Sequence, residues 1–183
     1  GVGGSVETFV AEMNATARQL GMRESNFTNP NGWYDPLQVT SARDMAILAR
    51  AIYRDYPQSA LLYKATGVQL GKRLIRGHNS LLGRFEGADG MKTGFTCPSG
   101  FNLVASAQRG QRRIIAVVMG EANAKERTQH AAQMLEAGFG SWTFWRTGQE
   151  VHTLASTPSE APNMRAEICE KKKVAPEAVG EVA

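Results

Sequence analysis

Two runs of strand-forming residues, 101–108 and 112–119, are separated by only three residues, and this pattern constrains the fold more than any other in the chain. Because so short a connection joins antiparallel neighbours, the pattern predicts a β-hairpin with its turn at Gly110. The second run, "RRIIAVVMG", is apolar almost throughout. It therefore indicates a central strand that is buried on both faces.

The first predicted helix spans residues 5–20. Its apolar residues recur at helical spacing, Ser5 suits the N-cap position, and Gly21 can adopt the left-handed conformation that ends a helix. The stretch that follows, "NFTNPNGWYDP", has the composition of tight turns, so we expect a long loop there.

A second helix is predicted to begin at Thr40 or Ser41, either of which can cap it. Asp44 stands three residues after Ser41, which is the spacing of a capping box. The helix should end near Tyr56, before a proline.

A third helix is predicted over residues 125–137, after the hairpin. We expect Met134 and Leu135 to face inward and Gly138 to end the helix. Weaker strand signals stand at residues 68–70 and 73–75. The order helix, helix, irregular region, hairpin, helix predicts an α/β, or α+β, fold in which helices cover a mainly antiparallel sheet.

Composition fits one globular domain, with 42% hydrophobic and 21% charged residues. We assign residues 1–146 to that domain. Residues 147–183 are rich in Pro, Ala, Glu and Lys, and are expected to be a tail or the start of a truncated C-terminal segment. The net charge of +4 is small and scattered, so nucleic acid is not an expected partner.

Residues 92–94 form a Lys-Thr-Gly triplet just before the hairpin. On a strand that borders a cleft, the Lys92 ammonium supplies positive charge and the Thr93 hydroxyl can donate a hydrogen bond to an anionic substrate. Gly94 allows a ligand backbone to approach, and the Phe95 N–H can point at a developing oxyanion. An extended peptide could also pair with such a strand.

Several ordered stretches resemble one family. They are "FVAEMNATARQLGM" with "SNFTNPNGW", "TSARDMAILAR", "HNSLL", "GADGMKTGFTCPSGFNLVASA", "RRIIAVVMG" and "LEAGF". In this order they resemble the low-molecular-mass penicillin-binding proteins, the serine-type D-alanyl-D-alanine carboxypeptidases of bacterial cell walls. The likeness covers residues 5 to about 140. It implies a serine β-lactamase/transpeptidase-like fold that is incomplete on its N-terminal side.

The resemblance implies hydrolysis of the terminal D-alanine of peptidoglycan stem peptides through an acyl-enzyme, with acylation by β-lactams. Lys92 then takes a catalytic place, while Thr93, Gly94 and Phe95 bind substrate, the last through its oxyanion-directed amide. The family implies a periplasmic or other extracytoplasmic location and no cofactor.

The companion motifs of this mechanism, Ser-x-x-Lys and a Ser-x-Asn segment, do not occur in the 183 residues. Acyl transfer of this kind needs an activated serine, so the chain alone is predicted to be inactive. We expect an N-terminal complementary chain or a swapped copy to complete the sheet. The alternative is a non-catalytic module that binds peptidoglycan or a partner through the retained strand, and a serine β-lactamase is a weaker third reading.

Two cysteines, Cys97 and Cys169, lie far apart in the sequence, which leaves open a disulfide or two separate thiols. The oxidising compartment implied by the family supports a disulfide but does not decide between the two outcomes. The three histidines have no metal-ligand spacing, so no metal site is predicted. Asn79 is a candidate to hold a loop, and Asp89 to orient the Lys-Thr-Gly strand or to pair with an arginine.

Overall fold

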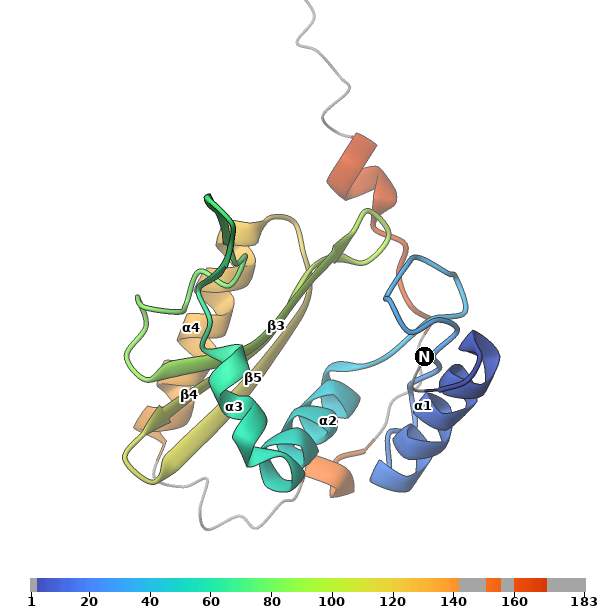
Figure 1. The fold of residues 1–183 in the computed structure, drawn as a ribbon, viewed down its shortest axis with the longest axis horizontal. Coiled ribbons are helices and arrows are strands. Elements are labelled where there is room, and N and C mark those ends of the chain that lie inside the picture. Colours follow the sequence, from blue (N-terminus) through green and yellow to red (C-terminus); the bar gives the residue numbers. More distant parts are fainter. Residues whose placement is uncertain (1–2, 142–150, 156–159, 171–183) are drawn as a thin grey trace, which may run out of the picture.

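The computed structural model describes residues 3–141, 151–155 and 160–170. Its main sheet has three antiparallel strands in the order β3-β4-β5, namely β3 (Ala88–Thr96), β4 (Gly100–Arg109) and β5 (Arg112–Glu121) (Figure 1). The predicted hairpin is confirmed as β4 and β5, whose last pair is Arg109 with Arg112. Gly110 has a φ of 59° in the turn, a conformation that favours glycine.

The central strand of this sheet is β4, and not β5 as the apolar run predicted. Residues 103–107 of β4 are all buried. Among the described residues β5 lies at the sheet edge, yet it contacts helix α2 (Ala42–Asp55) on one face and helix α4 (Ala124–Gly140) on the other (Figure 1). A run of apolar residues indicates that both faces of a strand are covered, and here two helices cover them. It does not indicate that the strand has a neighbouring strand on each side.

Helix α1 (Val6–Leu20) matches the first predicted helix. The Ser5 hydroxyl accepts a hydrogen bond from the Thr8 N–H at 3.1 Å, and Gly21 ends the helix with a φ of 81°. Ala17 and Met22 are buried with Ile47 of α2 in a small second cluster. Thus α1 packs on α2 and not on the sheet (Figure 1).

Helix α2 begins after Ser41, whose hydroxyl accepts from the Asp44 N–H at 3.2 Å. The second half of the predicted capping box is wrong. The Asp44 carboxylate is fully buried and accepts from the Glu24 N–H and the Ser25 hydroxyl at 2.7 and 2.8 Å, beside Arg43 at 2.8 Å. Its charge therefore fastens the loop after α1 to the start of α2, because a buried carboxylate requires several donors.

Helix α4 runs to Gly140, so the predicted stop at Gly138 is wrong. A Cβ at Gly138 would lie 2.9 Å from the Ile114 side chain, and this glycine therefore permits close packing on β5. Leu135 is fully buried as predicted, but Met134 is 48% exposed. Successive helical residues are about 100° apart, and the buried neighbour of Leu135 is Ala131, one turn earlier.

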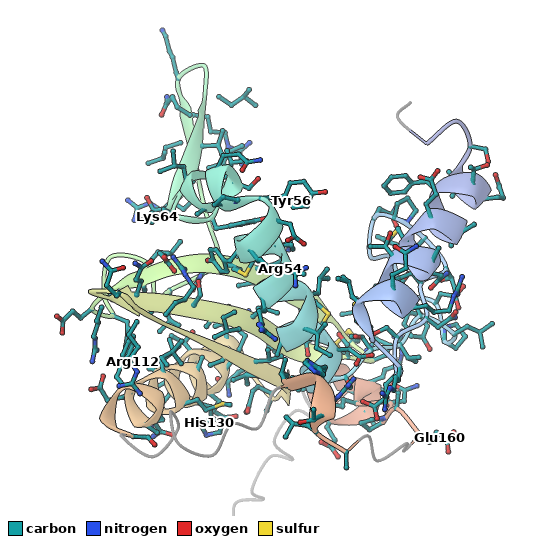
Figure 2. All side chains as sticks on the ribbon, turned by 90° about the horizontal axis from the view of Figure 1, so that it is seen from below. Arg54, Tyr56, Lys64, Arg112, His130 and Glu160 are labelled. Carbon is teal, nitrogen blue, oxygen red and sulfur yellow. A yellow bond between two sulfur atoms is a disulfide. The ribbon has the colours of Figure 1, made fainter. Side chains whose placement is uncertain are left out.

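The weaker strand signals are confirmed as a separate two-stranded ribbon, β1 (Gly67–Leu70) and β2 (Arg73–Arg76). It follows two short helices, η1 (Pro57–Ser59) and α3 (Ala60–Tyr63). Figure 2 shows this ribbon projecting away from the main sheet beyond α3. None of the described helices is long and apolar enough to cross a membrane.

The described parts of the C-terminal region contact the rest of the fold. Arg43 donates to the backbone oxygens of His152 and Leu154, in and just after η3 (Val151–Thr153). The final described helix, η4 (Ala166–Glu170), contains a buried Ile168. The predicted domain boundary at residue 146 lies outside the described residues.

Candidate functional site

The Lys-Thr-Gly triplet lies on β3, an edge strand of the described sheet. Lys92 is opposite Val104, Thr93 is opposite Leu103, and both belong to the antiparallel pairing of β3 with β4. No strand among the described residues pairs with the other side of β3. The outer edge of β3 is therefore free of strand pairing within the described residues, and a ligand or another chain segment can approach it.

The four predicted site residues are contiguous, and the pleat of β3 separates them into two pairs. Lys92 and Gly94 point to one face of the strand, Thr93 and Phe95 to the other. The Lys92 ammonium is exposed and donates to the Thr93 backbone oxygen. A ligand can reach both the Lys92 and the Thr93 side chains only if it lies along the open strand edge.

Phe95 is 49% exposed, and its ring lies 4.2 Å from the Phe101 ring on β4. This aromatic pair covers the end of the strand that carries the triplet. Its half-exposed ring leaves an apolar surface beside Gly94, which is also exposed.

A buried polar network holds the N-terminal half of β3, three residues before Lys92. The Asp89 carboxylate, 3% exposed as a residue, lies 2.6 Å from the Arg113 guanidinium and accepts from the Ser106 hydroxyl at 2.7 Å. Both roles proposed for Asp89 from the sequence, orientation of the strand and pairing with an arginine, are thus present. The network connects all three strands, because Asp89, Ser106 and Arg113 belong to β3, β4 and β5 in turn.

Tyr53 of α2 closes this network from above the sheet. Its hydroxyl lies 2.5 Å from the Ser106 hydroxyl, and the Arg113 guanidinium lies 3.9 Å from the centre of its ring. Burial raises the pKa of the Tyr53 phenol, and the nearby Asp89 charge adds to that shift. The phenol therefore remains neutral and can serve as a hydrogen-bond donor at ordinary pH.

Gly90 permits the close approach of α2 and α3 to β3. A Cβ at this position would lie 2.5 Å from the Tyr53 hydroxyl and 2.8 Å from the Ser106 hydroxyl. Asn79 holds the same residue from the preceding loop, since its side-chain amide donates to the Gly90 oxygen at 3.0 Å and accepts from the Leu81 N–H at 3.2 Å. The loop-holding role predicted for Asn79 is confirmed.

Cys97 and Cys169 form a disulfide in the structure, with their Cα atoms 5.8 Å apart. Cys97 lies in the turn between β3 and β4, directly after the candidate site, and Cys169 lies in η4. The Met164 N–H also donates to the Pro98 oxygen at 2.9 Å. The turn that follows Phe95 is therefore fixed to the C-terminal segment 160–170.

A depression of about 400 Å³ lies at the opposite end of β3, where Lys64, Leu82, Ala88 and Gln108 line it. None of residues 92–95 contributes to it. The triplet lies away from this depression, on the edge of β3 that no described strand occupies. Within the described ranges, no three Asp, Glu, His or Cys side chains gather closely enough to hold a metal ion.

Sequence reasoning missed Tyr53, Ser106 and Arg113 as supports of the site. Ser106 gave a usable signal, because it is a polar residue within the apolar run "LVASA" of a predicted strand. A polar side chain in such a place needs a partner. Nothing in the sequence identified Tyr53 as that partner.

Comparison with known proteins supports the resemblance. The D-alanyl-D-alanine carboxypeptidase family, peptidase family S11, matches residues 1–123. A protein described as D-alanyl-D-alanine carboxypeptidase DacA from Haemophilus influenzae is 39% identical over 155 residues, which are 82% of this chain and 39% of that protein. DacC from Escherichia coli is 37% identical over 139 residues, which are 75% of this chain and 35% of that protein.

Solved structures show the same relationship. Penicillin-binding protein 5 from Haemophilus influenzae superposes with a TM-score of 0.71 at 41% identity, over 75% of this chain and 40% of that one. Ampicillin-bound penicillin-binding protein D2 from Listeria monocytogenes superposes with a TM-score of 0.67 at 30% identity, over 72% of this chain and 55% of that one. The chain therefore belongs to the D-alanyl-D-alanine carboxypeptidase family, has its serine β-lactamase/transpeptidase-like fold as predicted, and spans about two fifths of the length of the DacA relative.

Proposed function

We propose that this chain supplies the substrate-carboxylate and oxyanion half of a serine D-Ala-D-Ala carboxypeptidase site. The observation that carries the proposal is the position of Lys92 and Thr93. They lie on the open edge of β3, and an ion pair between the buried Asp89 and the partly exposed Arg113 anchors that strand. A fixed strand with an exposed ammonium and an edge that no described strand occupies suits an extended peptide that ends in a carboxylate.

The proposed roles follow from the chemistry of each group. Lys92 and Thr93 bind the terminal carboxylate of the stem peptide or the acidic group of a β-lactam, through charge-assisted hydrogen bonds. Gly94 leaves space for the ligand backbone. The Phe95 N–H donates to the oxygen that becomes negative when the carbonyl is attacked, and one such donor contributes about 3–4 kcal/mol to transition-state stabilisation.

The attacking serine and its base come from outside these 183 residues, because the chain has no Ser-x-x-Lys. We propose that an N-terminal complementary polypeptide, or a swapped copy, completes the sheet and brings the serine to the Lys-Thr-Gly strand. The unpaired outer side of β5 supports this arrangement, since helices cover both faces of β5 while no described strand occupies its edge.

Two further assignments belong to the same proposal. Residues 1–146 form the C-terminal part of the catalytic domain, and residues 147–183 form a following segment, part of which the disulfide attaches to the domain. The protein works in a periplasmic or other extracytoplasmic compartment, where a disulfide between Cys97 and Cys169 persists.

Intact-mass spectrometry before and after incubation with a penicillin tests the proposal. The purified chain should remain a single unmodified species. When a polypeptide that carries the Ser-x-x-Lys and Ser-x-Asn segments is supplied, that polypeptide should gain the penicillin mass. A penicillin adduct on the chain alone would contradict the assignment of the nucleophile to another segment.

Lys92→Ala in the completed domain should lower the rate of penicillin acylation about 10- to 100-fold, the effect of losing one hydrogen bond to a charged group. Lys125→Ala, an exposed lysine of α4, is the matched control and should leave the rate unchanged. Equal rates for both variants would remove Lys92 from the site. A completed domain that binds stem peptide without any acylation would favour the non-catalytic module.

A further inference from the structure

The projecting ribbon carries an apolar surface that the fold leaves open. We define the basic arm as residues 60–76, which comprise α3, β1 and β2. Six large apolar side chains of the arm are between 46% and 75% exposed. They are Leu61, Leu62, Val68, Leu70, Leu74 and Ile75.

Charge in this region is entirely of one sign. Residues 56–85 contain five basic residues and no Asp or Glu, and four of the five, Lys64, Lys72, Arg73 and Arg76, belong to the arm. The whole chain holds 21 basic and 17 acidic residues, so its charges nearly balance once these five are set aside. In the part of the chain that the structure describes, no salt bridge neutralises the four residues of the arm.

The apolar residues occupy both faces of the ribbon. Val68 is paired with Ile75 on one face, and Leu74 is paired with Gln69 on the other. The two-residue turn places Lys72 at the tip, with Arg73 beside it. Figure 2 shows the ribbon standing clear of the body, with Lys64 at its base.

We propose that the basic arm binds the surface of an anionic phospholipid bilayer. Lys72 and Arg73 would meet lipid phosphates, while Leu70 and Leu74 would enter the boundary between headgroups and acyl chains. A fluid lipid layer can surround both faces of an inserted tip, whereas one protein surface covers a single face. Repulsion between the like charges of two arms disfavours a second copy of the chain as the occupant.

Sedimentation of the purified protein with lipid vesicles tests this inference, which does not depend on the acyl-transfer chemistry. The protein should bind vesicles of phosphatidylcholine mixed with phosphatidylglycerol and should bind pure phosphatidylcholine far more weakly. Binding to the anionic vesicles should fall as salt is added. Failure to bind anionic vesicles would overturn the inference.

Substitutions assign the binding to the arm. Lys72→Gln with Arg73→Gln should lower the partition coefficient about 25-fold, which is about fivefold for each basic residue. Arg18→Gln with Lys125→Gln is the control, because it removes the same amount of charge from exposed positions of α1 and α4. This control should change the partition coefficient no more than about twofold. Leu70→Ser with Leu74→Ser should weaken binding without any change of charge.

The arm substitutions should leave the thermal melting temperature unchanged, since their side chains lie outside the two buried clusters. Equal vesicle binding by the arm variants and by the Arg18/Lys125 control would show that another segment binds lipid, and would overturn the inference. Arm-dependent dimers in gel filtration, without vesicle binding, would identify the arm as a protein interface instead.

Discussion

The ion pair beneath the candidate strand gives a quantitative prediction for Asp89→Asn. The substitution keeps the shape of the side chain and a hydrogen-bond acceptor for Ser106, but removes the charge that faces Arg113 at 2.6 Å. Breaking a fully buried pair costs about 3–5 kcal/mol. Since the Arg113 side chain is 24% exposed, we expect a smaller loss, about 2–3 kcal/mol of the free energy of unfolding.

Urea denaturation measures this loss, as a lower midpoint with an unchanged m-value. The corresponding fall in melting temperature is about 4–12 °C for a domain of this size. Glu136→Gln is the matched control, because it removes the same chemical pairing from Arg109 at 2.8 Å, with the carboxylate 62% exposed. That exposed pair should contribute less than about 1 kcal/mol.

Equal effects of Asp89→Asn and Glu136→Gln would refute the reasoning, since burial would then make no difference. A double variant provides a second check. Asp89→Asn combined with Arg113→Met should cost less than the sum of the two single variants, with a coupling energy of about 1–3 kcal/mol. Additive effects would place the loss elsewhere than in the ion pair.

Two further predictions concern Tyr53 and its neighbours. Gly90→Ala should lower the free energy of unfolding by about 1–3 kcal/mol, because the new Cβ would lie 2.5 Å from the Tyr53 hydroxyl. In thermal melts, Tyr53→Phe in the same protein should relieve part of this loss. Purely additive effects of the two substitutions would contradict the clash. Burial raises the pKa of Tyr53 in the folded state, so its neutral form stabilises the fold. This contribution to the free energy of unfolding is complete below the ordinary tyrosine pKa of about 10. It is lost as the pH rises through the higher pKa of the folded state. Ultraviolet titration should show a late-ionising tyrosine signal that Tyr53→Phe removes.

Local signals in the sequence were sufficient for much of the secondary structure. Ser5, Gly21 and Ser41 marked helix ends correctly because a cap depends on the residue itself and on its nearest neighbours in the chain. The hairpin of β4 and β5 was equally local. The predicted helix stop at Gly138 was wrong, because this glycine is needed for close packing on Ile114. Ile114 is distant in the sequence, so local signals do not reveal that contact.

The candidate site divides in the same way. Lys92 to Phe95 were found from a contiguous motif, and the ordered stretches around it identified the family. The supports of the motif could not be found so, because Asp89, Ser106 and Arg113 are brought together only by the register of three strands. Both cysteines were evident, but the spacing of Cys97 and Cys169 left two outcomes open until their proximity was known.

The sequence by itself determined the positions of α1, α2, the β1–β2 ribbon and the β4–β5 hairpin, the family of the chain, and the absence of a serine nucleophile motif from these 183 residues. Only the tertiary structure decided that β4 is the central one of the described strands, that no described strand pairs with the outer edge of β3, and that Tyr53 and Arg113 contact the polar network that holds β3. The physical reason is the separation along the chain over which each kind of interaction acts. Caps, turns and motifs act over a few residues, whereas burial and ion pairing depend on which distant segments share one core.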